Sequence, residues 1–182
     1  KVGSVQGSVG TTVKIPLELS GVPASGINNS DFTLTYDPNV LEVLDVEPGN
    51  IIKDGSKDFK SNVNPERGRI STMFVDETGR GQRMITSDGT YATITAKVLK
   101  QEPATITIAK DKNGIFSDYD FNSISFKFEE GGVNLSSSAT PTPVRPTSPG
   151  TTPTVPPSSG GTTLTVASVD ASVGSTVEIP VY

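Results

Sequence analysis

The sequence predicts an all-β fold: a nine-stranded antiparallel β-sandwich with jelly-roll topology, followed by an extended Pro/Thr-rich linker. Through residues 1–135, apolar residues recur at every second position in short stretches, as from Val13 to Leu19 and from Phe32 to Tyr36. Turn sequences rich in Gly, Pro, Asn and Asp separate these stretches. Period-two alternation with frequent turns is typical of antiparallel sandwiches. No segment shows a helical period.

The strand candidates repeat this alternation along the chain. The candidate that ends at Leu19 contains Pro16, which predicts an edge strand or a β-bulge, because proline cannot donate a ladder hydrogen bond. Later candidates end at turn sequences such as Asp37-Pro-Asn39 and Asn113-Gly114. The apolar sets that define four candidates are Val13, Ile15, Leu17 and Leu19; Phe32, Leu34 and Tyr36; Ile94, Ala96 and Val98; and Ile124, Phe126 and Phe128.

Residues 136–163 differ in composition from the rest of the chain. Of these 28 residues, 21 are Pro, Ser or Thr, including half of the chain's 14 prolines. Such a stretch buries too little apolar surface to offset its ordering entropy, so we expect an extended, solvated segment. This composition is typical of linkers between secreted modules. The chain therefore divides into a module at 1–135, a linker at 136–163 and a further segment at 164–182.

The segment at 164–182 repeats the start of the chain. At a constant offset of 164, residues 166–182 match residues 2–18 at 10 of 17 positions. A period of one domain plus one linker indicates tandem domains. We expect the truncated N-terminal strands of a second module copy here, in a chain that opens on Lys1 as a mature or excised fragment of a longer protein. A further hypothesis is that this stub pairs with a sheet edge of a neighbouring molecule, which the sequence does not decide.

The composition argues against several classes of function. A net charge of −5 disfavours nucleic acid, and no apolar run approaches the length of a bilayer span, so no membrane insertion is expected. Cys and His are both absent, which removes the preferred zinc ligands and every Ser-His-Asp or Cys-His site. Only carboxylate, Lys or Tyr chemistry is left for an enzyme. No cofactor is expected on this chain.

The alternation also predicts which residues face away from the core. A mixed polar and apolar outer face suits protein docking, with hydrogen-bonding groups around adaptable apolar contacts. The alternative is that Met73 and Phe121 lie under loops in a satellite core. The outward residues that this reasoning selects are Asn29, Asp31, Thr33, Thr35, Ser71, Met73, Val75, Phe121, Ser123 and Ser125.

Several motifs resemble those of a known family. GINNSDF at 26–32 runs into YDPNVLEV at 36–43, FVDETGRG at 74–81 precedes ITSDG at 85–89, and GGVNL closes the module at 131–135. These motifs resemble the type I cohesins of cellulosomal scaffoldins. The resemblance implies a secreted, non-catalytic jelly-roll module that binds the dockerin of plant-cell-wall-degrading enzymes. It also implies that the calcium belongs to the dockerin and that linkers join neighbouring modules of one scaffold.

The resemblance further implies which residues contact the dockerin. Asn29 and Asp31 match positions expected to hydrogen-bond a dockerin helix, and Met73 matches an apolar contact. At Asn64 this sequence departs from the family, which has an aromatic or apolar residue there. The remaining positions, in the loop after Met73 and near the eighth strand, are Asp76, Thr78, Gly79, Phe121 and Ser123.

Three other functions are alternatives. A carboxylate glycosidase would use an acid pair such as Asp76 with Glu77 or Asp118 with Asp120, although such neighbours usually form solvated turns. A carbohydrate-binding sandwich shares the fold and linker but stacks sugars on Trp and Tyr, and the chain has no Trp. A cell-surface adhesive or spacer domain is compatible with the composition. The stretch at 111–120 resembles part of a calcium loop. With Gly114 at the sixth loop position, the first position falls on Ala109, where an acid is required, so a plain turn is favoured.

Overall fold

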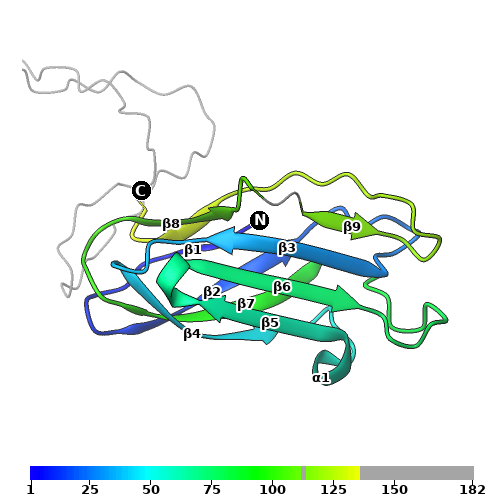
Figure 1. Ribbon diagram of the computed structural model, residues 1–182, viewed down its shortest axis with the longest axis horizontal. Helices are drawn as coiled ribbons and strands as arrows, with labels where there is room; N and C mark the ends of the chain where they lie inside the picture. The colour runs from blue at the N-terminus through cyan, green and yellow to red at the C-terminus, as the bar shows by residue number, and fades with distance from the viewer. Residues whose placement is uncertain (112–113, 136–182) are drawn as a thin grey trace, which may run out of the picture. The chain divides into compact units, whose positions relative to one another are not determined.

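The computed structural model describes residues 1–111 and 114–135 (Figure 1). The predicted linker at 136–163 and the second copy at 164–182, with its hypothesised strand pairing, lie outside the described residues. The elements in chain order are β1 (Ser4–Val5), β2 (Thr12–Leu19), β3 (Asn29–Thr35), β4 (Leu41–Pro48), α1 (Gly55–Asp58), β5 (Phe59–Asn64), the 3-10 helix η1 (Pro65–Arg67), β6 (Arg69–Val75), β7 (Gly89–Val98), β8 (Ala104–Ile108), β9 (Ile115–Ser117) and β10 (Gly131–Val133).

The strands form two sheets around one core. One sheet has the order β1-β10-β8-β3-β6-β5, with β9 also paired to β3, and the other has the order β2-β7-β4. The chain passes repeatedly from one sheet to the other, and Figure 1 shows β3, β6 and β5 in front of β2 and β7. The predicted all-β sandwich is therefore confirmed.

The strand inventory differs from the prediction in two details. The described residues contain ten strands, not nine, because pairings only two or three residues long at β1, β9 and β10 are included. The sandwich is also not wholly antiparallel, since β1 pairs with β10 in parallel, with Ser4 opposite Gly132. The first and last strands of the module thus run side by side in one direction. Alternation along a single strand carries no information about either detail.

The predicted strand through Ile124, Phe126 and Phe128 is wrong. Ile124 and Phe128 pack partly buried against the core, but Phe126 is 42% exposed and no strand forms there. The stretch joins β9 only through an isolated bridge at Ser123 and a 2.8 Å bond from the Ile124 N–H to the Phe116 carbonyl. Because β9 is only three residues long, it offers too short an edge for a full strand to pair with.

The core consists of the inward-facing residues of both sheets. Leu34 and Ile70 of one sheet and Ile15 and Ile94 of the other have no exposed surface. Burying an aliphatic side chain of this size contributes about 1.5–3 kcal/mol to stability. The prediction from Pro16 is confirmed, since β2 is an edge strand of its sheet and its register shifts two residues further on, between Leu17 and Glu18.

An aromatic group ties the two sheets together. Tyr91 of β7 packs on Phe32 of β3, with ring centroids 5.4 Å apart, and on Phe59 of β5 at 5.6 Å. The Tyr91 hydroxyl lies 3.0 Å from the Ser30 hydroxyl, so its polar atom is satisfied inside the core. Burial raises the pKa of Tyr91 to about 12.

Candidate docking face

The outer surface of β5, β6, β3 and β9 brings predicted binding residues together. Asp31 lies opposite Met73 of β6 and Ile115 of β9, and Met73 lies opposite Lys60 of β5. Directly opposed residues on neighbouring strands share one face of the sheet. These four residues therefore form a row across four strands, with Asn29 two residues from Asp31 on the same face. We call Asn29, Asp31, Lys60, Met73 and Ile115 the Asp31 face.

The two apolar side chains of the Asp31 face are open to solvent. Met73 is 43% exposed and Ile115 is 54% exposed, while the residue on either side of Met73 along β6 is buried. Asp31 and Lys60 are exposed, and Asn29 is half-buried. The alternative that Met73 lies in a satellite core is thus wrong. In this row the two apolar residues lie on either side of Asp31, and Lys60 lies beyond Met73, a combination suited to a protein partner.

Asn64 lies at the far end of the same sheet surface. It pairs with Arg69, and β6 runs from there to Val75, a distance of about 20 Å at roughly 3.3 Å per residue. The Asn64 side-chain oxygen accepts a 3.1 Å bond from the Arg67 N–H and so caps η1. The residue that departs from the family pattern thus has a local structural role in this chain.

Asp76 begins the loop that follows β6. The prediction treated it as an acidic contact residue, but the structure leaves it only 4% exposed. One carboxylate oxygen accepts bonds from the Thr78 N–H (2.9 Å) and hydroxyl (2.5 Å), and the other accepts from the Arg83 N–H at 2.7 Å. Burial by itself raises the pKa of Asp76, but these hydrogen bonds outweigh it and hold the pKa below its usual value. The carboxylate thus organises the loop from within.

Thr78 and Gly79 form the outer part of this loop. The Thr78 hydroxyl accepts the N–H groups of Arg80 and Gln82, both at 3.3 Å. Gly79 is exposed at a φ of 64°, a left-handed conformation that glycine adopts without a steric penalty. Its carbonyl accepts a 3.1 Å bond from the Tyr119 hydroxyl, which joins the loop to the turn after β9.

That turn carries Phe121, the most exposed large apolar residue of the described chain at 79%. Asp118 builds the turn by accepting the N–H groups of Asp120 and Asn122 at 3.0 and 2.9 Å. Phe121 has a φ of 62°, which is unusual for a bulky residue and costs on the order of 1–3 kcal/mol. Ser123 is exposed beside it. Strain that places an aromatic ring in solvent is typical of a functional position.

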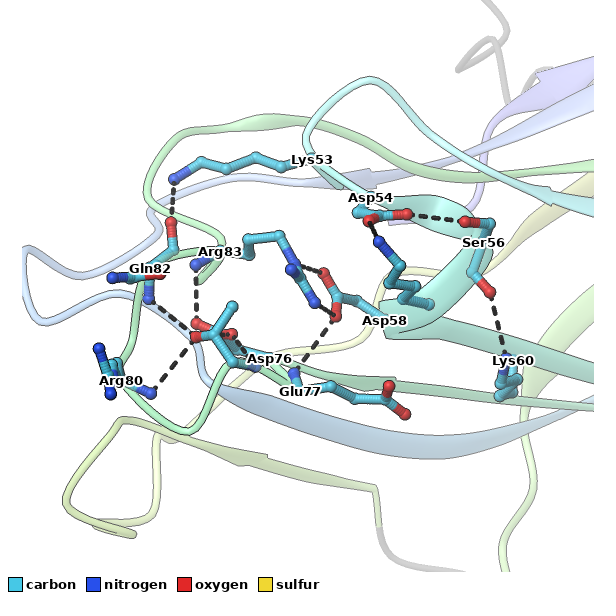
Figure 2. Close-up of polar contacts among 12 residues, drawn as sticks. Lys53, Asp54, Ser56, Asp58, Lys60, Asp76, Glu77, Arg80, Gln82 and Arg83 are labelled. Carbon is cyan, nitrogen blue, oxygen red and sulfur yellow. Dashed lines mark hydrogen bonds and ion pairs between the residues drawn. The ribbon is translucent and has the colours of Figure 1, made fainter.

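A partly buried ion pair between Asp58 and Arg83 adjoins the loop (Figure 2). The Arg83 guanidinium donates from Nε to Asp58 Oδ2 at 2.5 Å and from Nη2 to Oδ1 at 2.7 Å. The Asp58 side chain has no exposed surface, whereas 24% of the Arg83 side chain is exposed. The hydrogen bond with Asp58 raises the pKa of Arg83 above its usual value.

Sequence reasoning missed four residues of this region. Ile115 could have been found, because it directly precedes the buried Phe116 and alternation places it outward. Lys60 also alternates with a buried neighbour, Phe59, but nothing local shows that it lies beside Met73. Asp58 and Arg83 are 25 residues apart in the chain, and no local pattern joins them.

One carboxylate of each pair nominated for glycoside hydrolysis has a local structural role. Asp76 and Asp118 are both bound within turns, and both pKa values are lowered; for Asp118 the main cause is the hydrogen bond from the Asn122 side chain. A glycosidase proton donor needs a raised pKa. Within residues 1–111 and 114–135, no three acidic side chains gather in a way that could hold a metal ion, and no helix is long and apolar enough to span a membrane.

Comparison with known proteins identifies the family. The cohesin domain family model matches residues 1–135. The chain belongs to the cohesin family. It is 47% identical over its whole length to cellulosomal-scaffolding protein A of Acetivibrio thermocellus, and 40% identical over 73% of its length to cellulosomal-scaffolding protein B. This cohesin spans only 9% of the first relative and 18% of the second.

Solved cohesin structures share the fold. The seventh ScaB type I cohesin of Pseudobacteroides cellulosolvens is 37% identical with a TM-score of 0.66, covering 76% of this chain and 91% of its own. A type I cohesin–dockerin complex from Clostridium thermocellum, Coh-OlpC-Doc435, contains a chain that is 32% identical with a TM-score of 0.67. That match covers 72% of this chain and 88% of the other.

Proposed function

We propose that this cohesin is a non-catalytic scaffold module that binds dockerin modules of secreted plant-cell-wall-degrading enzymes. The observation that carries the proposal is the row of Lys60, Met73, Asp31 and Ile115 across four strands. Two exposed apolar side chains on either side of an acid have no role in the core of the module. It does suit a partner that packs and hydrogen-bonds at once.

The dimensions of the surface fit an α-helix. The strands extend about 20 Å from the row of Asn64 to that of Val75, which is the length of a helix of about 13 residues. A partner helix along this surface would pass Asp31 and Met73 and reach the loop at 76–83. We expect a total buried area of roughly 1,200–2,000 Å², the usual size of a specific interface.

A carbohydrate-binding role is a weaker proposal for this surface. Sugar-binding sandwiches present flat rows of aromatic side chains, but Tyr36 and Tyr91 are buried in the core. The exposed aromatic residues of the described chain lie in the turn after β9 and the stretch that follows it, as Tyr119, Phe121 and Phe126. None of them lies on the strands that carry the Asp31 face.

The wider setting follows from the same proposal. The relatives of this chain are named as cellulosomal scaffolding and anchoring proteins, which supports a location outside the cell. The Pro/Thr-rich stretch at 136–163 would then connect this module to its neighbour and let several enzymes act on one substrate. Calcium in this arrangement would be bound by the dockerin.

Calorimetric titration of the full chain with a type I dockerin, in calcium and again with a chelator, tests the proposal. We expect tight one-to-one binding in calcium and its loss on chelation, because the calcium-loaded dockerin is the binding form. Failure to bind any dockerin of a panel, together with measurable binding to cellulose or xylan, would replace the proposal with the carbohydrate-binding alternative.

A further inference from the structure

The loop at 76–83 is attached to the rest of the module through two buried carboxylates. Asp58, at the end of α1, receives both donors of the Arg83 guanidinium fork and the Glu77 N–H at 3.2 Å. Asp76 receives the Thr78 N–H and hydroxyl and the Arg83 N–H. Arg83 therefore binds Asp58 with its side chain and Asp76 with its main chain. Figure 2 shows both carboxylates on either side of Arg83.

This arrangement holds the loop at both ends. Glu77 at its start and Arg83 at its finish bind the same Asp58 carboxylate, so the five residues between them close on one point. The bidentate geometry also fixes the direction of approach, because the planar guanidinium fork matches a carboxylate in only one plane. Few other loop conformations satisfy both contacts at once.

Fold stability alone does not account for such a pair. Removing the Asp58 carboxylate from water is costly, and its attraction to the partly exposed Arg83 offsets this only with good geometry and further hydrogen bonds. Apolar residues of similar volume often stabilise a protein equally well or better. What a partly buried, bidentate pair contributes beyond stability is a defined local conformation, and the conformation defined here is that of a loop next to the Asp31 face.

We propose that Asp58 and Arg83 are positioning residues that hold the 76–83 loop in the conformation that the dockerin binds. The proposal rests on the proposed function. It also assigns Asp76 to the loop itself, since both of its carboxylate oxygens are occupied by loop donors. The partner would then contact the loop through exposed groups at Glu77, Gly79 and Arg80, and through a main chain whose path Asp58 and Arg83 determine.

Four variants of the full chain test this, each titrated with a calcium-loaded type I dockerin: Asp58→Asn, Arg83→Gln, the double variant, and Asp54→Asn as the control. Asp54 lies four residues before Asp58 and pairs at 2.9 Å with Lys57, whose side chain is 63% exposed, and it makes no bond to the 76–83 loop among the described contacts. We call Asp58→Asn, Arg83→Gln and the double variant the clamp variants, because the Asp58–Arg83 pair clamps the loop. If the loosened loop adopts the binding conformation about a tenth of the time, each clamp variant raises the apparent Kd for dockerin about tenfold. The control is expected to stay within about twofold.

The double variant shows whether the two residues act as one unit. We expect the double variant to bind the dockerin no more weakly than the weaker single variant, since either change alone already breaks the pair between Asp58 and Arg83. A loss equal to the product of the two single losses would overturn the proposal, as would wild-type affinity in Asp58→Asn and Arg83→Gln. Arg83→Lys keeps the charge without the fork, and we expect an intermediate affinity. Wild-type binding by this variant would contradict the role of bidentate geometry.

Amide hydrogen exchange of the free protein gives a readout that needs no dockerin. The N–H groups of Glu77, Thr78 and Arg83 bond to the two carboxylates, so they should exchange faster in the clamp variants, while those of β3 and β6 stay protected. Unchanged exchange at these three amides would overturn the proposal even if affinity fell. If the wild-type chain binds no dockerin, the proposed function fails, but the exchange data still test the clamp.

Discussion

The two sheets of this cohesin enclose the same core but present different outer surfaces. On the three-stranded sheet, Thr95 of β7 lies between Lys14 of β2 and Asp45 of β4, so the row is polar throughout. On the other sheet, the row that contains Asp31 includes two exposed apolar side chains, Met73 and Ile115. Both sheets bury apolar side chains on their inner faces. The outward difference is therefore not needed for folding and points to binding.

An isolated apolar residue does not change this comparison. Leu44 is 51% exposed on the three-stranded sheet, at the register shift between Val43 and Asp45. A β-bulge directs a side chain away from the regular pattern, and single exposed apolar residues are common on protein surfaces. Met73 and Ile115 differ because they belong to one row with Asp31 between them.

The largest expected effect comes from placing a charge at the centre of the Asp31 face. Met73→Asp should weaken dockerin binding by about a hundredfold or more, because an unpaired carboxylate would be buried against the partner. Leu44→Asp, the matched change on the other sheet, should alter affinity by less than about twofold. Calorimetric titration, with melting curves to show that both variants fold, measures the difference. Equal losses in the two variants would remove the distinction between the faces.

The core shared by the two faces should weaken at alkaline pH. The unfolded chain ionises its tyrosines near pH 10, whereas folded Tyr91 keeps its proton until about pH 12. The contribution of protonated Tyr91 to the free energy of unfolding is therefore complete below pH 10. It should fall by about 2–3 kcal/mol as the pH rises from 10 to 12. Denaturant unfolding across this range measures the loss. Tyr91→Phe should show a shallower decline, and the same slope in both proteins would contradict the assignment to Tyr91.

Asp31 should contribute to binding through hydrogen bonds. We expect Asp31→Ala to weaken dockerin binding by about 1–3 kcal/mol, because donors on the partner would be left unpaired. Glu42→Ala removes an exposed acid from β4 on the other sheet and serves as the control, with little expected change. If Asp31→Ala binds as tightly as the wild-type chain, the dockerin uses a different surface.

The smallest effect is expected on the polar face. Lys14 and Glu47 form an ion pair at 4.0 Å with side chains 70% and 56% exposed. Exposed pairs of this kind contribute little, so Lys14→Ala should change the free energy of unfolding by less than about 1 kcal/mol and leave dockerin affinity unchanged. Thermal and denaturant unfolding measure the first value. A loss of affinity here would show that binding extends to the three-stranded sheet.

Local patterns predicted much of this fold correctly. The alternation through Phe32 and Leu34 placed Asp31 outward on β3, and Pro16 predicted the edge position of β2. The same pattern failed at Phe126, because alternation shows that a stretch can form a strand but not that a partner edge is available. The exposure of Phe121 depends in turn on a positive φ, which no periodicity predicts.

The sequence by itself determined the fold class, most of the strands, the inward and outward sides of those strands, and the family. These properties are local or motif-based, since side chains alternate with a period of two whatever the neighbouring strand is. Tertiary structure decided which outward residues become neighbours. Lys60 and Ile115 join Met73 and Asp31 only through the order β5-β6-β3-β9, and the bond between Asp58 and Arg83 forms only when the loop after β6 folds back onto α1. Contacts between residues distant in the chain depend on pairing and loop closure, which local alternation does not encode.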